Sequence, residues 1–333
     1  MKTAVIILNW NGKKLLEQFL PSVVNYSAGA DLYVADNNST DDSVSFLKSK
    51  YPEIQIIQNR ENGGYAKGYN DALKEVKADI FCLLNSDVEV TPGWLEPVED
   101  IFKKHPEVGI VQPKILDQKR KGYFEYAGAA GGYIDMLGYP LCRGRIFQSL
   151  EEDTGQYNDV KEIFWASGAC FFVRSSVFRE LGGFDEDFFA HQEEIDFCWR
   201  TRNRGLTAFY TGHSHVYHVG GATLNNMNPK KTFLNFRNSL FSITKNVPRR
   251  YFLSVLVTRW FLDIIAAIRF VLQLRFQHFW AIVKAHISYG CQFRKMLAKR
   301  ENISEKNKYY IEKSIVWSYF VRNKKRFTDL IKY

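Results

Sequence analysis

The chain opens with TAVIILNWNG (residues 3–12), in which an unbroken apolar run ends abruptly in polar residues and a glycine. An apolar run without polar alternation is typical of a strand that is buried on both faces, as in a parallel sheet. Residues 13–26 then carry apolar side chains at helical spacing, which predicts an amphipathic helix. The chain therefore begins with a strand followed by a helix.

The same pattern recurs along about the first hundred residues. We expect further strands at residues 31–35, 54–57 and 80–84, and helices at residues 41–50 and 65–76. Strands that alternate with helices predict an α/β fold with a Rossmann-like, mostly parallel central sheet flanked by helices. Ligands of such sheets bind beyond the carboxyl ends of the strands.

Later segments are less regular. Beyond about residue 109 we expect, in order, loops or hairpins at 123–139, an apolar segment at 163–173, a helix at 193–204, and short strands or extended loops at 206–210 and 215–219. We place a boundary near residue 225. Residues 1–225 then form the α/β domain, and residues 226–333 form a helical, basic C-terminal region.

Within the C-terminal region, residues 251–284 are very apolar but contain no uncharged run of ten residues. A spanning helix needs roughly 20 apolar residues, so we expect none here. Most of the interrupting polar residues share one side of a helix, and Arg275 is the exception. This pattern predicts one or two amphipathic helices lying in a membrane interface. The alternative is an ordinary helical subdomain packed on the α/β domain.

The net charge of +9 belongs to the C-terminal end of the chain. Residues 284–333 contain 13 Lys and Arg against 4 Asp and Glu, and the rest of the chain carries 32 of each sign. A basic tail suggests an anionic partner, either lipid headgroups or nucleic acid. Because the tail has no recognisable nucleic-acid-binding element, we expect a membrane surface and no nucleic acid.

Five scattered cysteines without CxxC spacing indicate a reducing compartment rather than a disulfide frame or a zinc site. The apolar run at the N-terminus ends too early for a signal peptide. We therefore expect a cytoplasmic protein, peripheral on the inner face of the cell membrane.

The second expected strand ends in DNNSTDDS (residues 36–43). The Asp36 carboxylate could accept a hydrogen bond from the N3–H of a uracil or thymine ring, and Trp10 could stack on that ring. Asn38 lies in the same turn and is assigned with them to ligand binding. The alternative for Asp36 is a solvated loop carboxylate, while helix capping explains Ser39 and Asp41.

The third expected strand is followed by NGGYAKGYN (residues 62–70). Paired glycines let the backbone approach a ligand closely, and amides at a helix start can hold phosphate. Lys67 could add a positive charge. Taken alone, the segment is better explained as a simple glycine-rich turn.

The fourth expected strand runs into Asn85, Ser86 and Asp87. A hard oxygen ligand at this edge could hold Mg²⁺ or Mn²⁺ between the protein and a diphosphate. A second acidic cluster, with Glu193 and Glu194, opens a later helix. Such carboxylates can simply complement the helix dipole, but one of them next to apolar residues can have a raised pKa suited to a general base.

Taken in this order and spacing, the residues from about 3 to 221 resemble the family 2 glycosyltransferases with a GT-A fold, particularly the bacterial rhamnosyltransferase-like branch. The resemblance implies that Asp36 reads the base and that the segment from Asn62 to Asn70 helps to hold the donor. It further implies roles for the tripeptide at residues 85–87 in binding metal and diphosphate, and for His218 as a metal ligand.

The resemblance also places the catalytic base on the pair Glu193 and Glu194. Glu194 stands where most members have Asp, which leaves the choice within the pair open, and we prefer Glu194. Asn85 stands where many members have Asp, so Asp87 is the one carboxylate of that tripeptide. Trp165, Gly168 and Ala169 are expected to line the acceptor side, where an aromatic ring can stack on a sugar.

The implied activity is inverting transfer of a sugar from a UDP- or dTDP-linked donor to a glycan or lipid-linked oligosaccharide acceptor in cell-surface polysaccharide synthesis. The alternative is a non-catalytic homologue that binds nucleotide sugar or scaffolds a glycan assembly complex, which Asn85 favours. The sequence does not select the sugar, the nucleotide or the acceptor linkage.

Overall fold

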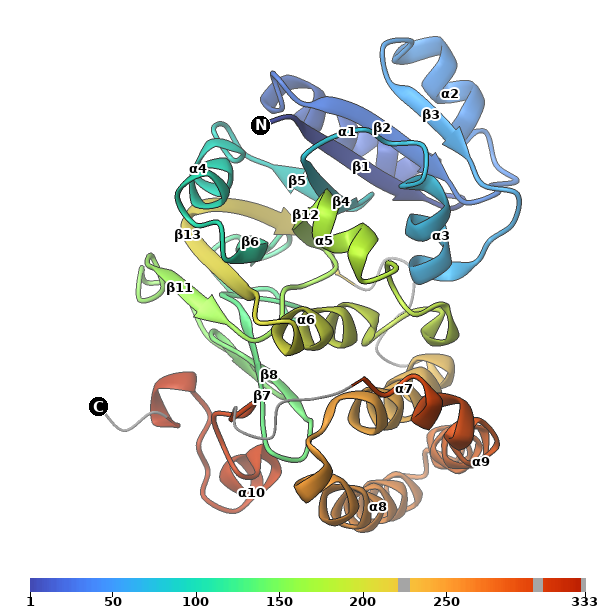
Figure 1. Ribbon diagram of the computed structural model, residues 1–333, viewed down its shortest axis with the longest axis vertical. Coiled ribbons are helices and arrows are strands. Elements are labelled where there is room, and N and C mark those ends of the chain that lie inside the picture. The colour runs from blue at the N-terminus through green and yellow to red at the C-terminus, as the bar shows by residue number, and fades with distance from the viewer. Residues whose placement is uncertain (221–227, 302–307, 331–333) are drawn as a thin grey trace.

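A computed structural model describes residues 1–220, 228–301 and 308–330. It has an α/β portion, followed by helices that pack against one end of it (Figure 1). The helices are α1 (Lys13–Tyr26), α2 (Ser43–Lys50), α3 (Gly64–Ala72), α4 (Glu96–Lys104), α5 (Ser175–Glu180), α6 (Glu193–Asn203), α7 (Pro229–Asn246), α8 (Arg249–Leu272), α9 (Phe276–Ala298) and α10 (Ile315–Phe320), with 3-10 turns at Glu186–Phe188 and Phe327–Asp329.

The main sheet has the strand order β11-β13-β6-β12-β4-β1-β2-β3, with β5 paired to β13. Its strands are β1 (Thr3–Asn9), β2 (Asp31–Asp36), β3 (Gln55–Gln58), β4 (Ile80–Asn85), β5 (Val88–Val90), β6 (Val108–Asp117), β11 (Val160–Ile163), β12 (Cys170–Arg174) and β13 (Thr207–His218). A second sheet contains β7 (Gly132–Ile134), β8 (Pro140–Cys142), β9 (Arg145–Ile146) and β10 (Ser149–Leu150).

The four N-terminal strands are parallel, as predicted. Beyond β4 the sheet is mixed, because β12 lies antiparallel between β4 and β6. The two strands expected at 206–210 and 215–219 form one strand, β13, which pairs in parallel with β6. A register irregularity between Thr211 and His215 separates its two halves and explains the gap in the sequence pattern.

The sheet is buried on both faces because its strand residues alternate between two apolar cores. Along β1, Val5 and Ile7 join the core formed with α1, α2 and α4, whereas Ala4 and Ile6 join the core formed with α3, α5 and α6. This double burial accounts for the unbroken apolar runs in the sequence.

The C-terminal helices share the second of these cores. Ile243 of α7, Val255 of α8 and Ile315 of α10 belong to the same buried cluster as Ile6 and Phe81 of the sheet. Next to Ile315, the Asp135 carboxylate accepts hydrogen bonds from backbone N–H groups on both sides, among them that of Ile315 at 2.8 Å. The helices from α7 onward are therefore packed onto the α/β portion.

Two further findings bear on localisation. Within the described ranges, no helix combines the length and the apolar composition needed to cross a membrane. All five cysteines are free thiols, and four of them are buried.

Candidate functional site

The carboxyl ends of three parallel strands bring the first candidate residues side by side. The β1–β2 register places Asn9 opposite Asp36, and the β1–β4 register places Leu8 opposite Asn85. The buried Asp36 carboxylate accepts hydrogen bonds from Asn9 Nδ2 (3.2 Å) and from the Ser39 backbone N–H (3.0 Å). These bonds fix the carboxylate at the sheet edge.

Trp10 follows β1 directly, and its side chain is 48% exposed. Asn38 lies in the turn after β2, is exposed, and has a positive φ of 61°. An exposed indole ring at the end of β1 is the kind of surface on which a planar base can stack.

The glycine-rich segment is joined to this edge through Asn37, whose Nδ2 donates to Asn62 Oδ1 (2.9 Å). Asn62 Oδ1 also accepts the Gly64 N–H at 3.0 Å, at the start of α3. Gly64 has a φ of +75°, and a Cβ there would collide with the Phe189 carbonyl oxygen. Only glycine lets the two segments approach so closely.

Lys67 and Asn70 make contacts within the protein. The Lys67 ammonium pairs with Asp71 one turn along α3 and lies 3.6 Å from Glu61. The Asn70 side chain exchanges hydrogen bonds with the backbone of Phe184, at 2.8 and 2.9 Å. Asn70 therefore ties α3 to the chain segment that leads to the acidic pair on α6.

Asp87 and His218 form a buried pair at the same edge of the sheet. His218 Nε2 lies 3.1 Å from Asp87 Oδ1 and 3.5 Å from the Asn85 amide nitrogen, and His218 Nδ1 lies 3.4 Å from Glu125 Oε1. Burial would lower the pKa of His218, but the carboxylates of Asp87 and Glu125 outweigh it and raise this pKa to about 10. Burial would raise the pKa of Asp87, and His218 brings it below its usual range.

The donor set at this point suits a divalent cation that also binds a diphosphate. Mg²⁺ and ions like it take one or two carboxylates plus phosphate oxygens and water, and imidazole is a ligand for the softer members. Among the described residues no group of three or more His, Cys, Asp and Glu side chains is arranged to enclose an ion by itself. Asp87 therefore fits a site that the phosphate oxygens of a substrate would complete, and His218 would have to give up its proton to serve as a second ligand there.

The acidic pair opens α6 at the end of a strained loop. Three of the residues that precede the pair, Phe189, His191 and Gln192, have positive φ angles of 64°, 69° and 73°. Such angles in residues other than glycine are uncommon and need support from the surroundings.

That support comes from α7. The Asn238 side chain donates to the carbonyl oxygens of Phe188 (2.9 Å), Ala190 (3.0 Å) and His191 (2.7 Å). Arg237 donates to the carbonyl of Asp187 at 2.9 Å. We call Asn238 and Arg237 the α7 clamp.

Ion pairs hold the start of the same loop. Lys245 of α7 and Lys299 after α9 both contact Asp185, where burial would raise the pKa of the carboxyl but the two ammonium groups bring it to about 2. Lys295 and Lys299 also pair with Asp187. Part of the basic C-terminal segment is therefore directed inward, onto the loop that carries the acidic pair.

Glu193 and Glu194 differ in their surroundings. Burial, and after it the charge of Glu194, raises the pKa of Glu193 well above its usual range. Burial raises the pKa of Glu194 to about 7, against the backbone N–H groups that favour its ionised form. Each carboxyl has one oxygen, Oε2, that is buried without a hydrogen-bond partner. A buried acceptor left open in this way is available to a substrate hydroxyl.

Residues 165–169 lie next to both the acidic pair and the Asp87 region. Tyr65 donates to the Gly168 carbonyl at 2.8 Å, and burial, with smaller contributions from Glu193 and Glu194, raises the pKa of its hydroxyl. On the other side the Asn85 N–H donates to the Ala169 carbonyl at 3.0 Å. A continuous series of neighbours therefore connects Asp87 to the acidic pair.

Trp165 lies deeper than an exposed platform for a sugar would. Its side chain is 3% exposed, it packs against Gly132, and its Nε1 donates to the Tyr133 carbonyl at 2.9 Å. In this structure the Trp165 side chain is part of the buried core and anchors residues 165–169 to the second sheet.

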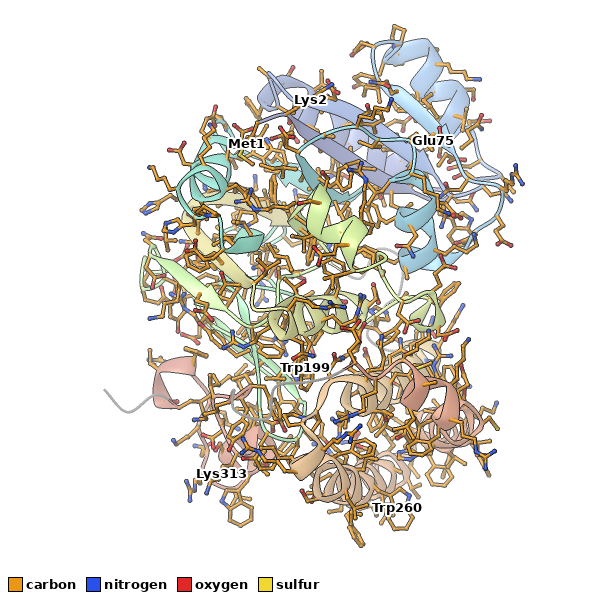
Figure 2. All side chains as sticks on the ribbon, in the orientation of Figure 1. Met1, Lys2, Glu75, Trp199, Trp260 and Lys313 are labelled. Atoms are coloured by element: carbon orange, nitrogen blue, oxygen red, sulfur yellow. The ribbon has the colours of Figure 1, made fainter. Side chains whose placement is uncertain are left out.

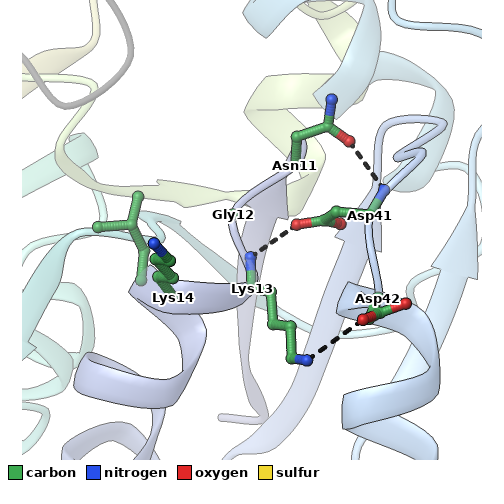
Figure 3. Close-up of a pocket in the computed structure, with 7 residues that line it drawn as sticks. Asn11, Gly12, Lys13, Lys14, Asp41 and Asp42 are labelled. Atoms are coloured by element: carbon green, nitrogen blue, oxygen red, sulfur yellow. Dashed lines mark hydrogen bonds and ion pairs between the residues drawn. The ribbon is translucent and has the colours of Figure 1, made fainter.

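A surface hollow lies beside the end of β1 (Figure 3). It is lined by residues 11–15, around the start of α1, and by Asp41 and Asp42, which precede α2. There the Lys13 N–H donates to Asp41 Oδ2 at 3.1 Å, and the Lys13 ammonium lies 3.4 Å from Asp42. None of the candidate catalytic or metal-binding residues lines this hollow.

Four contributors to the site were not singled out from the sequence: Asn9, Tyr65, Glu125 and Asn238. Asn9 ends an apolar run just as Asn85 does, so its position at a strand end is a signal that could have identified it. Glu125 lies in a stretch without periodicity, and Asn238 is one polar residue among several on α7. Their roles depend on contacts between segments that are distant in the sequence.

The arrangement combines an α/β sheet whose parallel strands end in polar side chains, a buried carboxylate–imidazole pair and an acid of raised pKa. Residues 4–182 match the model of the family described as Glycosyl transferase family 2. Because this match covers more than half of the chain, the protein belongs to that family and is a glycosyltransferase. The family predicted from the sequence is thus confirmed.

One relative is the N-acetylglucosaminyl-diphospho-decaprenol L-rhamnosyltransferase of Mycobacterium tuberculosis. It is 25% identical over 230 residues, which are 64% of this chain and 75% of the relative.

Two solved structures show the fold. GalNAc-T7 with UDP, GalNAc and Mn²⁺ has a TM-score of 0.57 at 15% identity over 73% of this chain, which spans only 47% of GalNAc-T7. TarS 1–349 of S. aureus with UDP-GlcNAc has a TM-score of 0.56 at 13% identity, over 93% of this chain and 99% of TarS 1–349. The expected GT-A fold is confirmed.

Proposed function

We propose that this glycosyltransferase inverts the anomeric carbon of a UDP- or dTDP-linked sugar and transfers the sugar to a glycan or lipid-linked glycan acceptor in cell-surface polysaccharide synthesis. The observation that carries the proposal is the difference between the two acids at the start of α6. Burial and the charge of Glu194 raise the pKa of Glu193 well above its usual range, whereas Glu194, with a pKa of about 7, can accept a proton near neutral pH.

In the proposed reaction Glu194 takes the proton of an acceptor hydroxyl held beside Gly168 and Ala169. The acceptor oxygen attacks the anomeric carbon as the bond to the diphosphate breaks on the opposite side. One displacement of this kind inverts the carbon, and the proton remains on Glu194 until it is released to solvent.

At the other end of the site we propose that Asp36, Trp10 and Asn38 bind the base, and that Asn62, Lys67 and Asn70 belong to the donor side. Asn85, Ser86, Asp87 and His218 would hold the diphosphate with Mg²⁺ or Mn²⁺. A bound cation would supply neutralisation of charge on the departing nucleoside diphosphate. The presence of UDP and Mn²⁺ in the GalNAc-T7 structure supports this proposal.

We also propose that the acceptor is lipid-linked and that the enzyme works at the cytoplasmic face of the membrane. By its name, the mycobacterial relative acts on a saccharide diphosphate attached to decaprenol, which supports an acceptor of this class. In this proposal residues 226–333 form the membrane-associated region.

Replacement Glu194→Gln tests the assignment, because the amide keeps the shape and cannot act as a base. We expect turnover to fall roughly 10²- to 10⁴-fold, with donor affinity nearly unchanged in a calorimetric titration with UDP- and dTDP-sugars and Mn²⁺.

The matched control is Glu193→Gln, which makes the same change in the neighbouring carboxyl and should lose less activity. Equal loss of donor binding and turnover in Glu194→Gln would contradict a catalytic role. Donor binding without any turnover by the unmodified protein would favour the non-catalytic alternative.

A further inference from the structure

Helix α8 of the α8–α9 hairpin has buried charged residues on one side and exposed apolar residues on the other. On α8, Arg259 and Asp263 are 2% and 1% exposed, whereas Leu272 is 79% exposed. The exposed apolar residues recur every three or four positions and so form one stripe: Leu253, Val257, Trp260, Ile264, Ile268 and Leu272. A helix that packs on a protein in water normally has the reverse distribution.

Specific contacts hold the polar side of α8 inward. Arg259 donates to the Leu137 carbonyl (3.0 Å) and to Ser239 Oγ (2.9 Å), and its guanidinium lies over the Tyr139 ring. Asp263 accepts hydrogen bonds from Tyr139 and is 3.1 Å from His286 Nε2 of α9. The orientation of the helix is therefore fixed by buried polar pairs, and its apolar side is left without a partner in the described chain.

The apolar stripe continues onto the neighbouring elements. Leu274 and Phe276 at the turn into α9 are exposed, and so are Trp317 and Phe320 of α10. The Arg269 guanidinium lies 5.3 Å from the centre of the Phe320 ring, which joins α8 to α10. Figure 2 shows Trp260 projecting outward at the end of the molecule away from the N-terminal sheet. We call this surface the hairpin face.

Charge on the hairpin face has one sign. α9 and α10 contain no Asp or Glu, and the one acidic residue of α8 is the buried Asp263. Arg269, Arg275 and Lys284 are exposed on or beside the face. An apolar stripe edged by cations and containing tryptophans matches the interfacial region of an anionic bilayer.

We propose that the hairpin face docks into the surface of a membrane containing anionic lipids, with α8 lying in the interface rather than crossing it. A second copy of the chain fits less well, because a symmetric contact would bring Arg and Lys against Arg and Lys. The proposal is argued from the α8–α9 hairpin. It deepens the proposed function by naming the class of lipid and the protein surface that binds it.

Vesicle binding by the full-length protein tests the inference. The protein is mixed with vesicles of phosphatidylcholine alone or of phosphatidylcholine with phosphatidylglycerol and separated by flotation. We expect binding to the mixed vesicles that weakens as salt is raised, because the cations are screened. Quenching of Trp260 fluorescence by brominated lipid, compared with Trp260→Phe, should locate this ring at the interface.

The deciding variant is Ile268→Ser/Leu272→Ser, which changes exposed side chains and should fold normally. Its partition into mixed vesicles should drop roughly ten-fold or more. The matched control Tyr26→Ser/Val160→Ser, which alters exposed apolar residues on α1 and β11, should bind as the unmodified protein does. Arg275→Gln/Lys284→Gln should weaken binding to mixed vesicles and reduce the dependence of this binding on salt.

Absence of binding to either vesicle, or equal binding by the Ile268→Ser/Leu272→Ser variant, overturns the proposal. Self-association that this variant abolishes, without vesicle binding, would assign the face to a second copy. Transfer to a short water-soluble acceptor should be unchanged in the variant. Loss of docking and failure of the proposed activity are therefore separate outcomes.

Discussion

At the edge of the sheet, polar side chains such as Asp36 and Asp87 stand at or just beyond the ends of strands whose apolar residues are buried. In α8 the arrangement is opposite, since Arg259 and Asp263 are buried in the protein while residues such as Ile268 and Leu272 are exposed. The first arrangement suits the binding of a polar ligand, and the second suits contact with an apolar environment. Burial of apolar residues thus identifies the core in one region and not in the other.

The largest effect is expected at the sheet edge. Asp87→Asn removes the charge that fits a cation, and activity should drop about 10²- to 10³-fold with Mn²⁺ affinity lowered about 10- to 100-fold. Mn²⁺ titration followed by electron paramagnetic resonance measures the affinity directly. Glu89→Gln, a change to a partly buried acid on β5 that pairs with Lys121, is the matched control and should leave both quantities unchanged. An unaltered Mn²⁺ affinity in Asp87→Asn would rule out this residue as a ligand.

The next effect is on the stability of the hairpin. Asp263→Ala leaves Arg259 buried without its carboxylate, and should lower the free energy of unfolding by about 3–5 kcal/mol. Ile265→Ala on the exposed side of the same helix should cost less than about 0.5 kcal/mol. Urea unfolding of both variants would compare them. Similar losses would mean that the apolar side of α8 is packed in solution.

A smaller effect links the two regions through the α7 clamp. Asn238→Ala removes the donor shared by three carbonyl groups of the strained loop, and should cost about 1–3 kcal/mol of stability. We also expect turnover to fall about 10-fold while donor affinity is preserved, since the loop positions Glu194 and not the donor. Asn235→Ala, on the same helix, is the control. A variant that loses donor affinity as much as turnover would contradict a specific role in positioning the base.

The smallest effect concerns pH. Because Glu194 must be ionised to act as a base, kcat/KM should rise with pH and level off above about 7. The same raised pKa affects stability. The folded state holds this proton more tightly than the unfolded chain, whose Glu has a pKa of 4.5, so the free energy of unfolding decreases as the pH rises from about 4.5 to about 7.

The part of this loss that belongs to Glu194 should be about 1–3 kcal/mol, and Glu194→Gln should remove that part. Thermal unfolding of both proteins across the range tests the sign. A decline that persists in the variant would belong to another group, such as Asp135, whose burial raises its pKa to about 7.

Much of the N-terminal sheet could be predicted, because a strand that is buried on both faces has a continuous run of apolar residues in the sequence. The helix expected at residues 13–26 and the strands expected near residues 31–35 and 80–84 are α1, β2 and β4. The helix expected at residues 65–76 ends earlier, at Ala72. The insertion of β12 between β4 and β6 could not be predicted, because strand pairing depends on distant partners and not on the pattern within a strand.

The C-terminal region was predicted in part. The sequence indicated one or two helices within residues 251–284, and the structure has two there, α8 and α9. It did not indicate that Arg259 and Asp263 face the protein, because periodicity shows that a helix has two sides but not what each side contacts. The assignment of Arg259 and Asp263 to the inside depends on Tyr139 and Ser239, which lie far away in the sequence.

The α7 clamp limits how this enzyme can be rebuilt by recombination. Its side chains support a loop that lies before residue 225 in the sequence, so a chimera joined there would exchange the C-terminal region and lose the support of the loop that precedes Glu193 and Glu194. A functional exchange would have to keep α7 with the α/β portion and begin the foreign sequence after Val247. We expect inheritance of the membrane hairpin to follow the same rule, with α7 travelling as part of the catalytic unit.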